Sequence, residues 1–242
     1  MCRIHPSTAL RVLVMAAATA MAVPATAQSR VVDEGTFSLF VGGVRVGRED
    51  FSIRTVGGGA SAGYVAQGNV LRGEVRLAVR MNTSASGTPL LFTLEESRDG
   101  RLTESLTGES RRDLWSGRAV RPAGETAREF RFPAGSLAAE AVVMHHLWFL
   151  IRFGEGRTTD VLHPRSLWVE QVSIEDAGPD RVSLGLREFV TRRWLIRPSG
   201  GEGVREAWTD LEGRLLRVRV PGEDLEAVRD EPPAETPGSG RT

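Results

Sequence analysis

Short segments that alternate apolar and polar residues, separated by glycine-containing turns, recur along most of this 242-residue chain. Residues 36–41 alternate with period two, and they are followed by Gly42 and Gly43, which readily adopt the positive φ angles of a tight turn. The alternation resumes at residues 44–46, but its parity changes before the next apolar residues, which predicts a β-bulge near Gly47. The pattern therefore predicts an antiparallel hairpin at the start of the domain.

The same pattern continues toward the end of the chain and predicts a mainly β fold. Turn residues separate the segments at intervals of about ten residues, as at Asp99-Gly100 and at residues 178–180 (Gly-Pro-Asp). The expected strands after the first hairpin cover residues 75–81, 90–94, 102–106, 128–132, 158–162, 167–174, 181–187, 192–197, 204–209 and 215–220. These spacings suit antiparallel strands with one wet face, so we expect a long antiparallel meander that forms a curved half-barrel or an open barrel.

One segment, residues 136–153, lacks this alternation and predicts a helix. Pro133 and Gly135 end the preceding strand, Ser136 stands where an N-cap is expected, and the segment contains no interior glycine or proline. Its apolar residues surround the helix axis instead of forming one stripe, so the helix should be buried on most sides. Because residues 148–153 are rich in bulky side chains, a strand at these residues is the alternative.

The N-terminus has the pattern of a signal peptide. Arg3 and Arg11 form a basic region, an uncharged apolar run covers residues 12–23, and residues 25–27 (Ala-Thr-Ala) match a signal-peptidase site. An uncleaved membrane anchor is the alternative, but it needs about 20 apolar residues to cross a bilayer. We therefore expect residues 1–27 to be removed and the exported product to be soluble in the periplasm or outside the cell.

The rest of the chain is expected to hold a single β-rich domain at residues 28–229 and a disordered tail at residues 230–242, which offers little to bury. The one cysteine, Cys2, lies in the signal, so the mature chain can form no disulfide. Removing the signal's two arginines from 31 basic residues leaves 29 against 31 acidic residues. This balance disfavours nucleic acid as a partner, and no later apolar stretch is long enough for a membrane span.

Few side chains in the mature chain are suited to catalysis. Its histidines are His145, His146 and His163, and adjacent histidines on a helix point about 100° apart, so they do not easily share a metal ion. A Gly-x-Ser-x-Gly string occurs at residues 59–63, but no helix is expected after it, and a nucleophile elbow requires one. No phosphate-binding sequence occurs. We therefore expect no catalytic residue, no metal site and no cofactor. A hydrolase that uses His146 or His163 with a carboxylate is a third hypothesis beside the two given below.

The unusual feature is the group of bulky apolar residues in the expected helix, beside so many amphipathic strands. A long meander curls, and its concave face must be filled. The helix can fill that face permanently as core, or it can act as a movable plug that gives way to an apolar ligand such as an acyl chain. In the second case the expected ligand-binding residues are Met144, Leu147, Trp148, Ile151 and Trp168.

Two segments of the chain resemble hairpins of known exported proteins. Residues 34–51 are similar to the opening hairpin of uncharacterised exported bacterial proteins, and residues 207–218 are similar to their closing hairpin. Those proteins in turn resemble the periplasmic lipoprotein-carrier half-barrels, in which a curved antiparallel sheet wraps a helix and holds lipid. The resemblance implies that residues 136–153 lie in the concavity and that no catalytic residue is carried over.

The leading hypothesis is an exported, non-enzymatic protein that binds a hydrophobic ligand or envelope component, lipid or lipoprotein-like, on the concave face of a curved sheet. The alternative is a structural or assembly partner whose outer surface or sheet edge recruits another cell-envelope protein. A structure distinguishes these hypotheses by showing whether an apolar cavity remains between helix and sheet.

Overall fold

The fold is described by a computed structural model, which covers residues 29–59, 62–201 and 203–234. The predicted signal peptide, residues 1–27, lies outside these ranges, as do residues 235–242 of the predicted tail. Within the covered ranges, no helix has both the length and the hydrophobicity that crossing a membrane requires.

The first residues of the predicted tail are described, and they contact the domain. The backbone N–H of Asp230 donates to the carbonyl of Thr36 at 2.9 Å. Farther along, the guanidinium of Arg214 donates to the carbonyl of Ala234 at 2.7 Å. These hydrogen bonds tie the start of the tail to the first strand and to the closing hairpin.

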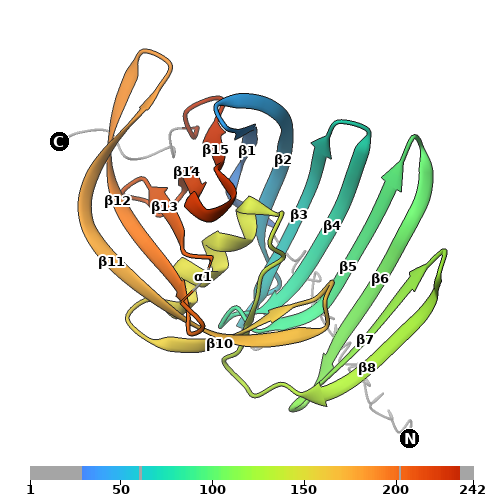
Figure 1. The fold of residues 1–242 in the computed structure, drawn as a ribbon. Coiled ribbons are helices and arrows are strands. Elements are labelled where there is room, and N and C mark those ends of the chain that lie inside the picture. The colour runs from blue at the N-terminus through green and yellow to red at the C-terminus, as the bar shows by residue number, and fades with distance from the viewer. Residues whose placement is uncertain (1–28, 60–61, 202, 235–242) are drawn as a thin grey trace, which may run out of the picture.

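The described strands form one large curved sheet that is not closed (Figure 1). Its strands are β1 (Arg30–Val41), β2 (Val44–Val56), β3 (Gly63–Arg72), β4 (Val75–Ser84), β5 (Pro89–Arg98), β6 (Arg101–Arg111), β7 (Leu114–Arg121), β8 (Gly124–Arg131), β9 (Leu137–Ala138), β10 (Thr158–His163), β11 (Trp168–Leu184), β12 (Arg187–Pro198), β13 (Arg205–Thr209), β14 (Leu215–Val220) and β15 (Leu225–Arg229). The helical elements are η2 (Met144–His146), α1 (Leu147–Gly154) and η3 (Pro221–Glu223). The predicted fold class is therefore confirmed.

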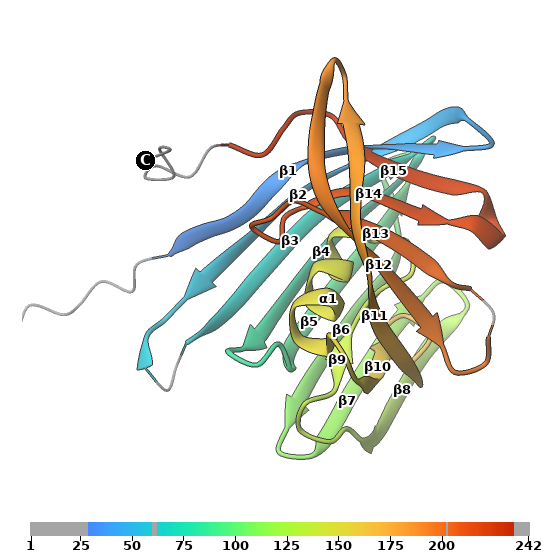
Figure 2. The same cartoon turned by 90° about the vertical axis from the view of Figure 1, so that its left-hand side faces the viewer.

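The order of the strands explains why the helix lies inside the curve. Strands β1 to β8 follow one another along the sheet, and strands β15 to β9 continue it from the other edge of β1, because β1 pairs with β15. The chain must therefore cross from β8, at one end of the sheet, to β9 and β10, at the other. Residues 132–136 make this step to β9. Strand β9 pairs in parallel with β10, so a crossover connection must join the two strands. This connection, residues 139–157, which we name the crossing segment, contains η2 and α1 and runs over the concave face (Figures 1 and 2).

The alternation in the sequence matches the burial of the strands. In β4, the side chains of Leu77, Val79 and Met81 are buried, whereas those of Arg76 and Arg80 are exposed. Buried side chains from both halves of the sheet and from α1 form one hydrophobic core. The period-two pattern thus predicted correctly which face of the sheet is dry.

The first hairpin forms as predicted, with its bulge in the expected place. Strands β1 and β2 pair around the two-glycine turn. Their register shifts between Leu39 and Phe40, so Val46 is an extra residue on β2, directly before Gly47. This bulge moves the apolar side chains of β2 onto the buried face, as the change of parity requires.

The helix is shorter than predicted. Only the second half of residues 136–153 is helical, as η2 and α1, and the helix predicted over the first half is wrong. Two residues of that half instead form β9, which pairs in parallel with β10, and the N–H of Ala139 donates to the carbonyl of Leu162 at 3.0 Å. The free edge of β10 thus supplies the hydrogen-bond partners that a helical turn would have supplied. The alternative of a strand at residues 148–153 is also wrong, because these residues lie in α1.

The turn predicted at residues 178–180 is wrong as well. Strand β11 continues through these residues, and its register with β12 shifts between Asp176 and Pro179. A proline has no N–H to donate, so it fits a bulge of this kind better than a regular ladder. The true turn follows at Gly185, whose φ is 58°, and the resulting long β11–β12 hairpin projects from the body of the sheet (Figure 2).

Candidate functional site

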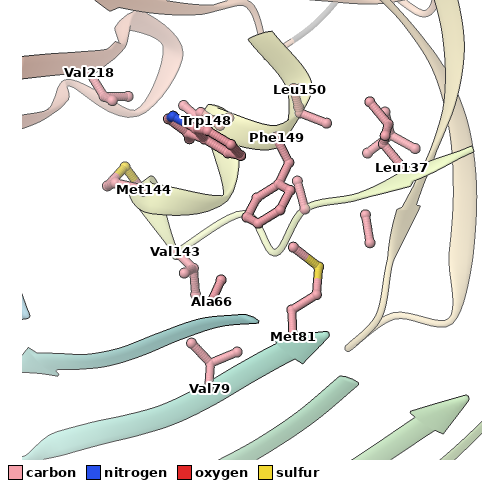
Figure 3. Close-up of a cluster of buried hydrophobic side chains, with 14 of the residues drawn as sticks. Ala66, Val79, Met81, Leu137, Val143, Met144, Trp148, Phe149, Leu150 and Val218 are labelled. Atoms are coloured by element: carbon pink, nitrogen blue, oxygen red, sulfur yellow. The ribbon is translucent and has the colours of Figure 1, made fainter. Parts of the chain in front are cut away.

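Helix α1 lies buried on the concave face. Its residues 147–151 are five consecutive buried side chains, none more than 6% exposed, so the prediction of burial on most sides is confirmed. Figure 3 shows Trp148 and Phe149 lying above Val79 and Met81 of the sheet. This part of the concave face is packed as core.

A buried carboxylate fixes the start of the helical segment to the sheet. Glu49 of β2 is fully buried, and its two carboxylate oxygens accept the backbone N–H groups of Met144 at 2.7 Å and His145 at 2.9 Å. The first N–H groups of a helical segment have no partner within the segment, so an acceptor from another element satisfies them. The ring Nδ1 of His145 also lies 2.6 Å from Glu49, and this ring stacks on Phe51.

The neighbouring His146 holds the segment before the helix. Its Nδ1 accepts the backbone N–H of Glu140 at 3.0 Å, and its ring packs edge-on against Phe92. Burial, and secondarily the nearby His145, lower the pKa of His146 well below 6.5. The imidazole is therefore neutral near pH 7, and the hydrogen bond to Nδ1 places its proton on Nε2.

The loop between β10 and β11, residues 164–167, crosses to the other half of the sheet; we name it the closing loop. Arg165 Nε lies 2.6 Å from Glu104 of β6, and its guanidinium also pairs with Glu96 of β5. Glu104 is shared with Arg121 of β7, at 2.5 Å. The backbone of the loop takes part too, since Arg121 donates to the carbonyl of Arg165 at 3.1 Å. Charged side chains thus join the two halves of the sheet across its open side.

Beneath the closing loop, the concave face retains a cavity of about 210 Å³. It lies between strands β3 to β5 on one side and the crossing segment and closing loop on the other. Its lining consists of Val70, Arg72, Val75, Leu77, Glu96, Val142 and Arg165. The cavity exceeds the roughly 150 Å³ that encloses a benzene ring, but it is below the roughly 300 Å³ at which drug-sized pockets begin. It therefore suits a small apolar group next to charged side chains.

The strand registers explain why these side chains converge. Val70 pairs with Leu77, Arg72 pairs with Val75, and Leu77 pairs with Glu96 in turn. Residues that pair directly across neighbouring antiparallel strands point to the same face. The cavity is therefore the part of the concave face nearest the β3–β4 turn, beyond the end of the packed core.

The cavity is not where the sequence analysis expected the ligand. The predicted residues Met144, Leu147, Trp148 and Ile151 are at most 6% exposed, belong to the packed core and do not line the cavity. Trp168 is 53% exposed at the start of β11, where its ring stacks on His163. The structure thus brings four of the five residues together and leaves Trp168 apart.

The charged lining residues carried a signal that the sequence analysis missed. Arg72 stands two residues after Val70, and Glu96 stands two residues after Leu94, so both share the parity of buried apolar neighbours. Glu49 likewise shares the parity of Phe51. A charged residue that takes an apolar position in the alternation of a strand has its side chain on the same face as the apolar residues, which here is the concave face.

The histidines lie away from the cavity lining. His146 is buried beside the helix, and His163 lies 2.6 Å from Glu170, its partner on β11. In the covered part of the chain, no three His, Cys, Asp or Glu side chains are grouped so that they could hold a metal ion.

Comparisons of the chain with known protein families, with curated proteins and with solved structures find no match.

Proposed function

We propose that this chain is an exported, non-enzymatic binding protein that holds a small hydrophobic ligand in the cavity beneath the closing loop. The observation that supports this proposal is the cavity itself, which lies beside the part of the concave face that α1 covers. Four of its seven lining side chains are aliphatic. A concave, mostly apolar site with a few charged groups is the usual form of a small-molecule site.

The dimensions of the cavity favour a small ligand over a whole lipid. Helix α1 packs in the concavity, and its buried side chains are part of the main core. Displacing them would expose several large apolar side chains, each worth about 1.5–3 kcal/mol of burial. The ligand therefore places one short apolar group in the cavity while the helix stays in position.

The proposal is tested by isothermal titration calorimetry with 1-octanol, a small uncharged apolar probe. Val70→Trp places a large side chain in the cavity, since Val70 lines it, and should abolish binding. Val190→Trp makes the same change at a residue that is 55% exposed and should leave binding intact. Leu77→Ala enlarges the cavity and should allow longer alcohols to bind. Circular dichroism establishes that each variant folds, and a lack of binding by the unaltered protein would refute the proposal.

A second candidate function is the assembly of a cell-envelope complex, which one observation favours. The projecting β11–β12 hairpin carries Leu186 fully exposed at its tip, with Val190 also exposed nearby (Figure 2). Exposed apolar side chains on a projecting hairpin are suited to contact another protein. A photo-crosslinking residue at position 186 should then capture one defined envelope protein in cells, and the same residue at the exposed position 102 should not.

A further inference from the structure

We infer that the ligand of the cavity is a medium-chain carboxylate, with its carboxylate bound by Arg72 and its hydrocarbon chain in the cavity. This inference rests on the proposed function and adds the chemical class of the ligand. It follows from three properties of the lining: its charge, the depth of its charged and apolar parts, and its volume.

The charges of the lining leave one guanidinium available. Arg165 and Glu96 pair with each other, so their charges compensate. Arg72, in contrast, forms no ion pair and no side-chain hydrogen bond with any residue that the structure describes. An arginine donates two parallel hydrogen bonds to a carboxylate, which makes it well suited to bind this group.

Three carboxylates near the cavity, those of Glu96, Glu104 and Glu140, are already engaged and do not compete for Arg72, while Glu74 is exposed in the β3–β4 turn and forms no ion pair with Arg72. The second oxygen of Glu96 accepts the hydroxyl of Thr103 at 3.1 Å. Glu104 lies between Arg121 and Arg165. Glu140, behind the closing loop, accepts backbone N–H groups and is not part of the lining. An incoming anion thus meets one unpaired cation next to carboxylates that have partners.

The depth of the side chains matches a molecule with one polar end. Arg72 is partly exposed at the end of β3, beside the β3–β4 turn. Val70 and Leu77, two pairs farther along the strands, are 1% and 4% exposed. The charged group of the ligand therefore stays at the rim, near water, while its chain is directed toward buried aliphatic side chains.

The volume limits the length of the chain. A cavity of about 150 Å³ encloses the six carbons of benzene, so about 210 Å³ encloses roughly eight carbons at the same density. Octanoate therefore fits, butanoate leaves much of the cavity empty, and palmitate is too long unless α1 moves. We expect affinity to peak near eight carbons.

The test measures the binding of octanoate and 1-octanol to the unaltered protein and to Arg72→Gln by calorimetry. Octanoate should bind the unaltered protein about five- to tenfold more tightly than octanol, and Arg72→Gln should remove that advantage while octanol still binds. Arg72→Lys keeps the charge and should restore part of it. Arg76→Gln is the matched control, because Arg76 is exposed on the other face and contacts Asn69.

The outcomes separate this inference from the proposed function. If octanol binds as tightly as octanoate, the carboxylate assignment is overturned and the apolar site remains. If palmitate binds more tightly than octanoate, the length limit is overturned. If neither octanoate nor octanol binds, both this inference and the proposed function fail. A preference for octanoate that weakens with added salt and disappears in Arg72→Gln supports the inference.

Discussion

The two parts of the concave face are held together by different forces. Under α1, buried apolar side chains and the fully buried Glu49 hold the helical segment against β2. Near the β3–β4 turn, the closing loop is held by ion pairs of Arg165, whose side chain is 32% exposed, and a cavity remains below it. The first part is a packed core, and the second is a partly exposed rim where the proposed ligand would enter.

This difference predicts where the loss of a polar contact lowers the stability of the protein least. A buried charge that loses its partners has no water to replace them, whereas an exposed one is solvated again. The same kind of contact, a carboxylate with a cationic or N–H donor, should therefore be worth more beside α1, where both partners are buried, than at the rim, where Arg165 is partly exposed.

The largest effect is expected for Glu49→Ala. The change leaves the buried N–H groups of Met144 and His145 without acceptors and opens a void in the core. The free energy of unfolding should fall by about 3–5 kcal/mol, measured by urea denaturation. The matched control is Glu34→Ala, which removes an exposed carboxylate paired with Arg54 at 3.4 Å and should change stability by less than about 0.5 kcal/mol. Equal effects of the two changes would contradict the comparison.

A loss of about 2–5 kcal/mol is expected for Leu150→Ala, which removes a side chain that is 1% exposed in α1 (Figure 3). The lost burial and the cavity left behind both lower stability. Leu102→Ala, at a residue that is 61% exposed, should change it by less than about 0.5 kcal/mol. Denaturation of both variants checks this prediction, and a small loss for Leu150→Ala would show that α1 is a loose plug.

The strands could be predicted from the sequence because period-two alternation depends only on nearby residues. Strands β3, β7 and β15 were nevertheless not predicted, and β7 contains Gly117. Strand β3 includes Gly63 and Gly68 and polar residues between its apolar ones, and β15 is five residues long. Gly68 has a tertiary reason, because a Cβ there would lie 2.5 Å from the ring of His145. The alternation of apolar and polar residues in the strand does not reveal this contact with a distant residue.

The rest of the site depends on contacts between distant residues. Arg72 and Glu96 could have been identified by their parity, but Arg165 lies in a loop, and only the fold brings it to Glu96, 69 residues away. The first half of the predicted helix has helix-forming residues, yet it pairs with β10, which comes about 20 residues later. A local pattern cannot anticipate the free edge of a later strand.

The pH dependence of stability tests the part of the concave face under α1, because His146 is buried there. The pKa of His146 in the folded protein is lower than its value of about 6.5 in the unfolded chain. As the pH falls below about 6.5, the unfolded chain takes up the proton first, so stability present at higher pH is lost, by at most about 1.4 kcal/mol per pH unit. Urea denaturation between about pH 7.5 and pH 5.5 measures this slope.

The variant His146→Gln isolates this contribution. Glutamine retains an acceptor for the N–H of Glu140 but has no proton to gain, so the slope should decrease by the contribution of one group. His163→Gln is the control, because His163 is paired with Glu170 away from α1. An unchanged slope in His146→Gln would show that water reaches this ring. The core beside α1 would then be as accessible to water as the rim.

The smallest loss of stability is expected at the rim, for Arg165→Met. When Arg165 is removed, Glu104 keeps its contact with Arg121 and Glu96 keeps the hydroxyl of Thr103. Their side chains are only 3% and 14% exposed, so the free energy of unfolding should fall by about 1–2 kcal/mol, less than in Glu49→Ala. Hydrogen exchange should nevertheless become faster in residues 164–167, because the closing loop loses its side-chain contacts with β5 and β6. Arg111→Met, at an exposed arginine paired with Glu109, is the control. A loss as large as that of Glu49→Ala, with unchanged exchange in the loop, would mean that the rim is as rigid as the core, and ligand entry beneath the loop would then require unfolding.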